Sequence, residues 1–529
     1  MSEAQPSRHE LFERLARSDA LDLVVIGGGA TGLGVALDAA ARGLSVALIE
    51  AEDFAKGTSS RATKLVHGGV RYLAQGNVAL VREALRERAH LLRNAPHLVQ
   101  PLAFVLPLYG ARGRWLDSWF YGAGLTLYDL LAGAGRLGRT EFLGRDAALE
   151  RAPGLRSDGL AGALQYWDGQ FDDARLAVAL ARTAIARGAI TLNHCAAVGL
   201  GHDGAGKVNG VLVEDHLSGR RLRVETRCVV NAAGVWVDGV RRMDRADCSD
   251  SLAPSQGVHI VVDRDFLPSK RAVLVPKTAD GRVLFAVPWL GKTILGTTDT
   301  PRSDLAAEPE PFDEEVRFIL GEAAEILARA PTRTDVRSVW VGLRPLVKPP
   351  DEDPGDTKAL SREHAVLVER TGLVTVTGGK WTTYRAMAED VLQHAVKAGL
   401  LPARPAGATL ALPLVGAPAR GEHALSEAPG LHLYGTEAQA VQALPGATRE
   451  LAPGLTEAMV RFAARHEYAR SVEDALARRS RLLFLDARLA AEVAERVAAV
   501  LAEELGDAFD AARSLRDFRA LAARYASVE

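Results

Sequence analysis

The stretch LDLVVIGGGATGLGVALDAAARGLSVALIEAE, residues 21–52, decides the fold class. It begins with apolar residues at positions 21 and 23–26, which are typical of a parallel strand buried on both faces. A glycine turn, an alanine-rich helix over residues 31–42 and a second apolar strand over residues 44–49 follow, and Gly43 stands where a helix C′ residue is expected. This order predicts a Rossmann-type α/β domain.

The glycine turn has the spacing of a dinucleotide-binding fingerprint. Gly27, Gly29 and Gly32 stand between the first strand and the helix, and Glu50 ends the second strand. Such glycines let the backbone approach a pyrophosphate, which faces the helix N-terminus, while the carboxylate accepts the ribose hydroxyls. No second fingerprint of this kind follows in a strand–helix context. We therefore expect one bound dinucleotide, FAD, and an electron acceptor other than a nicotinamide.

The residue pattern of the chain changes twice after this domain begins. Short alternating strands predict a mostly antiparallel substrate subdomain, and a stretch rich in proline, glycine and alanine is typical of a linker before a helical C-terminal region. We expect an FAD-dependent oxidoreductase domain over residues 1–400, a linker over 401–422 and a helical C-terminal domain over 423–529. Within the first domain, the FAD-binding parts are expected at 20–110, 150–250 and 345–400, and the substrate subdomain lies between them at about 255–344.

Composition and charge limit the classes of function. A formal net charge of −2 over 529 residues argues against a nucleic-acid-binding surface. The three cysteines show no metal-ligand spacing, so no metal site is expected. The N-terminus is charged and lacks the apolar segment of a secretory signal, and no apolar run is long enough to span a bilayer. We expect a cytoplasmic protein.

One segment has two interpretations. WLDSWFYGAGLTLYDLLAGAG, Trp115 to Gly135, is rich in leucine and aromatic residues and is flanked by arginines. It fits a buried helix pair with a glycine break. It also fits an amphipathic helix that lies on a membrane surface.

Several separate motifs give the chain a resemblance to a known family. The two longest are IGGGATGLGVALDAAARG, residues 26–43, and GGKWTTYRAMA, residues 378–388. Together with HGGVRYL, SQGVHIVV, GTTDT, VGLRPL and RHEYARSVEDALARRSRLLFLD, they resemble the FAD-dependent glycerol-3-phosphate dehydrogenases in order and spacing, from about Leu21 to Asp486. One departure is Leu33, where the family usually has a smaller residue, and it puts the local helix packing in question.

The resemblance implies oxidation of sn-glycerol 3-phosphate to dihydroxyacetone phosphate. The hydride on C2 moves to FAD while a base takes the proton of the C2 hydroxyl. A phosphate dianion needs concentrated positive charge, and the resemblance places Arg71, Arg344 and Lys380 at the active site, with Tyr72 beside them.

Two histidines are candidate bases, because imidazole titrates near working pH. His67 precedes a glycine pair and Arg71, and His259 lies early in a strand of the substrate subdomain. The residues do not decide between them, and an arginine that lowers the pKa of the substrate hydroxyl is a further alternative.

The remaining predicted contacts are with the cofactor. The resemblance implies that Ser59, Ser60 and Lys64, which follow Glu50, line the FAD. The small residues where the backbone can approach the cofactor are Gly68, Gly69, Ala233, Gly234, Gly378 and Gly379. Asp299, in GTTDT, is given no role beyond that of a turn residue.

The resemblance also implies a respiratory quinone as electron acceptor and attachment to the inner face of the cytoplasmic membrane, and a homodimer is considered. The sequence shows no quinone site. Three alternatives stay open: an oxidase that uses O2 on the same substrate, an FAD-dependent amine or amino-acid oxidase, and a flavin-bound scaffold without catalytic activity.

Overall fold

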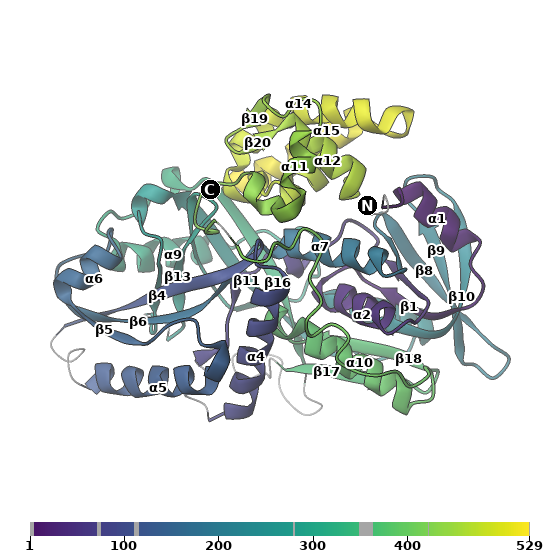
Figure 1. Cartoon of the computed structure of the whole chain (residues 1–529), viewed down its shortest axis with the longest axis horizontal. Coiled ribbons are helices and arrows are strands. Elements are labelled where there is room, and N and C mark those ends of the chain that lie inside the picture. Colours follow the sequence, from purple (N-terminus) through teal and green to yellow (C-terminus); the bar gives the residue numbers. More distant parts are fainter. Residues whose placement is uncertain are drawn as a thin grey trace.

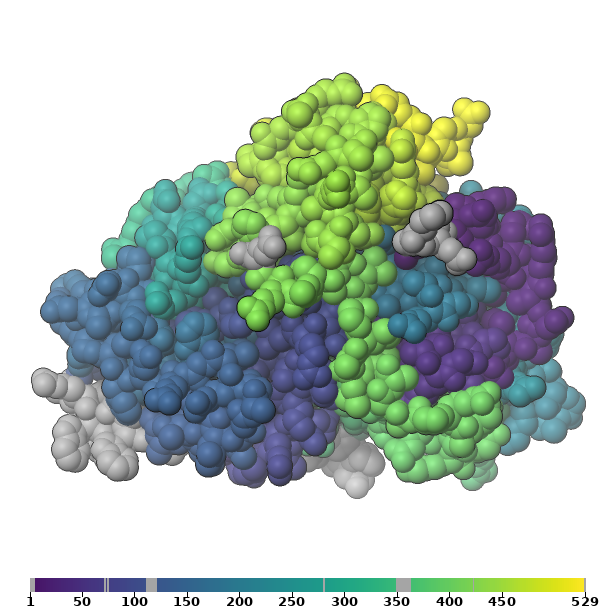
Figure 2. Space-filling view, in the orientation of Figure 1, coloured from purple at the N-terminus to yellow at the C-terminus, as the bar shows by residue number. Residues whose placement is uncertain are grey.

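The structure, a computed structural model, describes the chain except for residues 1–4, 71–72, 74–75, 111–115, 279–280, 349–362, 422 and 528–529. Two large sheets lie side by side, and helices from the last fifth of the chain lie across both (Figure 1). The space-filling view shows the same C-terminal helices resting on the two halves, with the chain from about residue 400 running up between them (Figure 2).

The first sheet is the predicted Rossmann-type sheet. Its strand order is β17-β18-β10-β1-β2-β7, and all neighbours are parallel except β17 and β18. A hairpin, β8 and β9, extends β10 at one end. The bounds are β1 Leu21–Ile26, β2 Val46–Ile49, β7 Ile190–Leu192, β8 Cys195–His202, β9 Val208–Asp215, β10 Arg221–Asn231, β17 His364–Val368 and β18 Leu373–Gly378.

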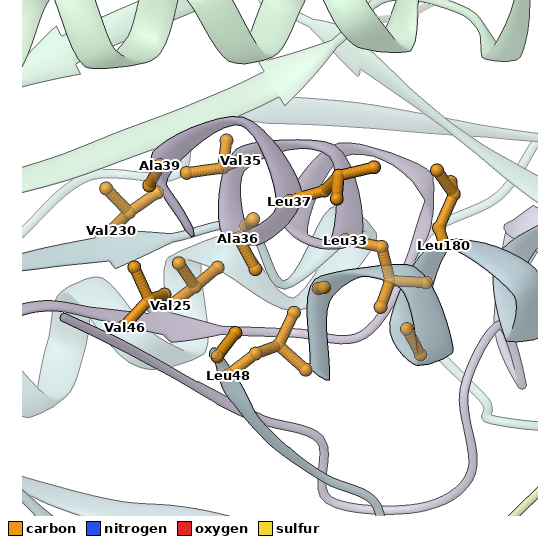
Figure 3. Close-up of a cluster of buried hydrophobic side chains, with 14 of the residues drawn as sticks. Val25, Leu33, Val35, Ala36, Leu37, Ala39, Val46, Leu48, Leu180 and Val230 are labelled. Carbon is orange, nitrogen blue, oxygen red and sulfur yellow. The ribbon is translucent and has the colours of Figure 1, made fainter. Parts of the chain in front are cut away.

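Helix α2 (Ala30–Ala41) follows the glycine turn and packs between α7 (Asp173–Ala186) and α10 (Tyr384–Lys397). Its apolar residues cover β1 and β2 in one buried cluster (Figure 3). Leu33 is fully buried in this cluster together with Leu180 of α7, so the larger side chain is accommodated inside the helix contact (Figure 3).

The second sheet has ten strands and is mostly antiparallel, as predicted for the substrate subdomain. Strand β11 pairs with both β14 and β16, and β4 pairs with β6 along nearly its whole length. The bounds are β3 Leu65–Val66, β4 Val99–Tyr109, β5 Glu141–Gly144, β6 Leu160–Phe171, β11 Leu252–Asp263, β12 Ala272–Val275, β13 Leu284–Trp289, β14 Lys292–Gly296, β15 Thr300–Pro301 and β16 Ser338–Val347.

The second sheet includes residues beyond those predicted for the substrate subdomain. Strands β4 and β6 belong to it, although the sequence groups residues 99–109 and 160–171 with the FAD-binding parts. The reason is a non-local pairing, since β4 lies parallel to β12 and connects the pair to the later strands. Helices α6 (Arg145–Arg151) and α9 (Asp313–Ile326) bury one face of this sheet.

The segment from 115 to 135 forms one helix, α5 (Leu116–Ala132), followed by a short 3₁₀ turn. The predicted break at a glycine is absent from the described part of this segment, because Gly122 and Gly124 lie inside the helix. Leu125 and Tyr128 are buried, whereas Leu127 and Leu130 are 42% and 75% exposed. The helix is therefore amphipathic and packs beside α4 (Val78–Asn94) with one face only.

The C-terminal region is helical, as predicted: α11 Ala438–Gln442, α12 Glu457–His466, α13 Leu482–Leu485, α14 Ala487–Leu505 and α15 Ala511–Ala526, with a small hairpin of β19 Glu450–Ala452 and β20 Leu455–Thr456. Its apolar residues continue into the second sheet, so that Trp289 and Trp340 lie in the same cluster as Phe484 and Val497. In the described part of the chain, no helix has the length and apolar character needed to cross a membrane.

Candidate functional site

The turn between β1 and α2 has no room for side chains. Gly27 has a φ of +110°, and a Cβ atom built on it would lie 2.5 Å from the carbonyl oxygen of Ala232. A Cβ atom on Gly32 would overlap the carbonyl oxygen of Gly27. The turn, the first turn of α2 and the chain that leaves β10 are thus in direct contact, and Ala233 and Gly234 follow immediately after that contact.

Glu50 ends β2 on the same side of the sheet as this turn. Its carboxylate accepts hydrogen bonds from the backbone N–H groups of Gly28, at 2.6 Å, and Glu52, at 2.9 Å. Burial raises the pKa of Glu50, and the two N–H donors oppose that shift. The carboxylate is fixed beside the glycine turn, at the carboxyl ends of the parallel strands where dinucleotides bind.

The residues of this turn fit an FAD. The N-cap of α2 is Gly29, which carries no side chain of its own, and such a helix terminus attracts a pyrophosphate. The Oγ of Ser59 accepts the N–H of Ala30, at 2.9 Å, which brings the 3₁₀ turn over Thr58–Ser60 to the helix N-terminus. Trp381, in the late GGKWTTY motif, donates its indole N–H to the carbonyl oxygen of Ser59 at 2.8 Å.

Lys64 is placed differently from its prediction. Its side chain is fully buried, and its Nζ donates to the carbonyl oxygen of Ser60 and to Asp173, both at 2.7 Å. Burial lowers the pKa of Lys64 to about 7, against the attraction of Asp173. The enclosed ammonium group therefore holds the carbonyl oxygen of Ser60 from the protein interior. It does not line a surface that is open to a cofactor.

The HGG loop, residues 67–69, lies against the late GGKWTTY motif. The N–H of His67 donates to the Oγ1 of Thr382, at 3.2 Å, so this loop touches the late GGKWTTY motif. Gly69, Gly378 and Gly379 have φ values of +78°, +77° and +76°, which favour glycine. Lys380 is half-buried directly after this glycine pair.

A tyrosine of α5 holds the next residue of the loop. The N–H of Gly68 donates to the hydroxyl of Tyr128 at 2.7 Å, and that hydroxyl donates to the carboxylate of Asp168 at 2.6 Å. Arg88 of α4 completes the network with a bond of 2.8 Å to the other oxygen of Asp168. Burial and the nearby Asp168 raise the pKa of Tyr128 well above its usual value, so the hydroxyl keeps its proton.

Arg344 is held from several sides on β16. Its guanidinium donates to Asp299 at 3.1 Å and to the carbonyl oxygens of Thr298 and Gln256 at 3.0 and 3.2 Å. It crosses the strand at Gly257, where a Cβ atom would overlap it. The side chain is still 23% exposed, and it remains accessible to a ligand.

Arg344 also lies near the cofactor-side turn, because the Oγ1 of Thr58 donates to the carbonyl oxygen of the preceding residue, Leu343. Gly378 approaches Val347 at the end of the same strand. The structure therefore brings the 58–60 turn, the end of β16 and the late glycine pair together.

His259 is enclosed, in contrast to the half-buried His67. It is 2% exposed, its Nε2 lies 2.9 Å from the Oγ1 of Thr63, and its ring stacks on Trp340 with centroids 5.3 Å apart. Burial, with the charges of Lys64 and Arg344, holds the pKa of His259 well below its usual value, so the imidazole is neutral. Arg71 and Tyr72 lie outside the described residues.

Comparison with known proteins gives this geometry a family. The family described as "FAD dependent oxidoreductase" matches residues 22–385, and the "C-terminal domain of alpha-glycerophosphate oxidase" matches residues 408–513. The mitochondrial glycerol-3-phosphate dehydrogenase of Arabidopsis thaliana is 42% identical over 92% of this chain and 83% of its own length. The human mitochondrial enzyme of that name is 41% identical over 94% of this chain and 72% of its own.

The chain belongs to the FAD-dependent glycerol-3-phosphate dehydrogenase family. A solved structure of the glycerol-3-phosphate dehydrogenase from Bacillus halodurans, complexed with FAD, matches 99% of both chains with a TM-score of 0.79 and 30% identity. The L-alpha-glycerophosphate oxidase from Mycoplasma pneumoniae shares the fold, with a TM-score of 0.56 and 16% identity over 74% of this chain and 98% of its own. The predictions of the family and of its cofactor, FAD, are confirmed.

The structure gives roles to residues for which the sequence predicted none. Asp299 and Thr298 hold Arg344, although the sequence gives Asp299 no role. Tyr128 and Asp168 hold the HGG loop from 60 and 100 positions away along the chain. No spacing signal connects such residues, because each pair meets only through the pairing of distant elements.

The Tyr128 network can be tested by removing one hydroxyl. In Tyr128→Phe, the N–H of Gly68 and an oxygen of Asp168 lose a buried partner, and we expect the free energy of unfolding to fall by about 1–3 kcal/mol. Amide hydrogen exchange should rise at Gly68 in particular. Tyr109→Phe is the matched control, because its hydroxyl donates to the carbonyl oxygen of Arg156 at another edge of the second sheet. Equal protection of Gly68 in both variants would contradict this role of Tyr128.

Proposed function

We propose that the protein oxidises sn-glycerol 3-phosphate to dihydroxyacetone phosphate with bound FAD and passes the electrons to a membrane quinone. The observation that carries the proposal is the extent of the similarity. Relatives named glycerol-3-phosphate dehydrogenase are 41–42% identical over more than nine-tenths of this chain. The match to the FAD-dependent oxidoreductase family covers residues 22–385, which include every segment of the site.

The chemistry divides between the cofactor and the chain. When FAD is bound, it supplies the acceptor for the hydride of the substrate. Arg344 and Lys380, with Arg71, supply positive charge for a phosphate dianion, and charge-assisted hydrogen bonds of this kind are the strong ones. Asp299 and two carbonyl oxygens fix the orientation of Arg344 before a ligand arrives, which reduces the entropy lost on binding.

His67 is our candidate for the base that takes the proton of the C2 hydroxyl. It is half-buried next to the glycine pair of the HGG loop, and its backbone is anchored by Thr382. His259 is less suited to direct proton transfer, because its imidazole is enclosed between Thr63 and Trp340. Its ring stacks on Trp340 of β16, the strand that carries Arg344.

The membrane contact is proposed on the outer face of α5. Leu127 and Leu130 are exposed there, and Phe142 of β5, which is 65% exposed, lies against Gly122 of the same helix. Arg136 and Arg139 are exposed just beyond the helix end. Apolar side chains beside arginines suit an anionic lipid surface. The quinone, a homodimer, a cytoplasmic location at that membrane and the domain bounds at residues 400 and 422 stay predictions.

Substrate and cofactor can be tested together by anaerobic reduction. Glycerol 3-phosphate should bleach the flavin absorbance at about 450 nm in the purified holoprotein. Arg344→Ala should lower kcat/KM by ~10²–10³-fold, because a phosphate contact is lost. Arg337→Ala is the matched control. Arg337 lies immediately before β16, the strand that carries Arg344, and this substitution breaks its ion pair with Asp263. Bleaching by an amino acid but not by glycerol 3-phosphate would refute the proposal. Release of hydrogen peroxide at the rate of substrate turnover would show that O2, and not a quinone, is the electron acceptor.

The base is tested by two histidine variants. His67→Asn should slow flavin reduction by ~10²–10⁴-fold at saturating substrate, since general-base catalysis is of that size. His259→Asn should reduce stability and leave a smaller effect on the reduction rate of the folded fraction. If His259→Asn slowed flavin reduction more than His67→Asn does, the base would be His259.

The membrane face is tested by co-sedimentation with vesicles that contain anionic lipid. Leu130→Asp combined with Phe142→Asp should lower the bound fraction at least ~10-fold, because both apolar contacts and part of the charge complementarity are lost. Leu212→Asp, at a position that is 40% exposed on β9, is the matched control. Unchanged binding of the double variant would move the membrane contact away from α5.

A further inference from the structure

An arginine of the C-terminal domain reaches into the centre of the molecule. Arg481 follows the π-helix over Asp474–Arg479 and is fully buried. Its φ is +65°, a left-handed conformation that is uncommon for a residue with a side chain. Residues persist in such a conformation where the surrounding contacts over-determine it, and these positions cluster at functional sites.

The contacts of Arg481 connect three parts of the chain. One nitrogen, Nη2, donates to the carbonyl oxygen of Ser60 at 2.9 Å and to Asp173 of α7 at 3.0 Å. The other, Nη1, donates to the carbonyl oxygen of Ala477 at 2.7 Å, and the guanidinium lies over the ring of Phe484. The side chain therefore links the C-terminal domain to the 58–60 turn.

Lys64 donates to the same two acceptors as Arg481. Its Nζ donates to the carbonyl oxygen of Ser60 and to the second oxygen of Asp173, both at 2.7 Å. The rings of Trp289, Trp340 and Phe484 are each 5.2 Å from this nitrogen. A single backbone carbonyl thus accepts from two buried cations, and one carboxylate bridges them. Ser59, the adjacent residue, accepts the first N–H of α2.

The start of the same loop is held by a second ionic cluster. Asp53 is fully buried and accepts from Arg478 and Arg479 of the C-terminal domain, the latter through both oxygens. Lys56 donates to Glu473 at 2.8 Å. Asp53 also lies with His194 and Asp474 in a group whose ligand atoms are within 4.8 Å, but the arginines already neutralise these carboxylates. The cluster is an ionic contact between domains.

We propose that the C-terminal domain is a clamp that holds residues 53–60 in the conformation that binds FAD, with Arg481 as its central positioning residue. A buried charge is costly unless it is paired, and docking of the domain adds the arginine partners of Asp53 and Asp173. Docking therefore fixes both ends of the loop, and the loop in turn fixes the hydroxyl at the N-terminus of α2. The inference rests on FAD binding and not on the identity of the substrate.

The test is the affinity of the full-length apoprotein for FAD, measured by quenching of flavin fluorescence. Arg481→Met keeps most of the side-chain volume and removes every donor, and we expect the Kd for FAD to rise at least ~10-fold. Arg481→Lys retains the charge with one donor group and should give an intermediate Kd. Arg513→Met, at an exposed arginine of α15, is the matched control and should leave the Kd unchanged.

A merely structural role would give a different pattern. It would lower the Tm of apoprotein and holoprotein equally, whereas weaker binding also shrinks the gain in Tm on adding FAD, because that gain depends on Kd. If Arg481→Met does not fold, Glu473→Gln loosens the tie to Lys56 and leaves Arg481 in place. It should raise hydrogen exchange over residues 53–60 and weaken FAD binding several-fold.

Two outcomes separate the possible failures. Unchanged Kd and unchanged exchange in folded Arg481 or Glu473 variants would overturn the clamp. Absence of FAD binding by the unmodified apoprotein would instead overturn the proposed function.

Discussion

The close approach of three backbone segments at the Gly27–Gly32 turn is the constraint on which the rest of the structure depends. A side chain at Gly27 would meet the carbonyl group of Ala232, and one at Gly32 would meet Gly27 itself. With these glycines, β1 and β10 lie next to each other as parallel strands and α2 starts directly above their ends. The N-terminus of α2, the carboxylate of Glu50 and the small residues after β10 then lie at one edge of the sheet, where a dinucleotide binds.

The two halves of the site are joined by backbone groups and hydroxyls more than by pairs of charges. Thr382 and Tyr128 bind the backbone of His67 and Gly68, and Thr58 binds the strand that carries Arg344. Such contacts fix the loops that present the charged groups of the site. Arg344 is also oriented by an ion pair, because Asp299 accepts from its guanidinium.

Buried ions have a different role at the domain boundary. Asp53, Asp173 and Lys64 are fully buried in the FAD domain, and the arginines at 478, 479 and 481 provide or share their partners. Helix α7 lies between α2 and the C-terminal helices (Figure 1). The carboxylate of Asp173, at the start of α7, accepts from both Lys64 and Arg481. Without the C-terminal domain, Asp53 would lose both of its arginine partners and Asp173 would lose Arg481, although Asp173 would keep Lys64.

Local patterns determined a large part of this protein. The apolar strand, the glycine spacing, Glu50 and the helix over residues 30–41 follow from short-range sequence, because strand burial, turn geometry and helix propensity act over a few residues. The sequence also predicted the antiparallel strands from about residue 255 and the helical C-terminal region. Only the tertiary structure decided that β4 and β6 join the second sheet, that Lys64 lies behind the cofactor turn, that His259 is enclosed, and that Tyr128, Asp299 and Arg481 support the site. Each of these outcomes depends on contacts between residues far apart in the chain, which no local pattern encodes.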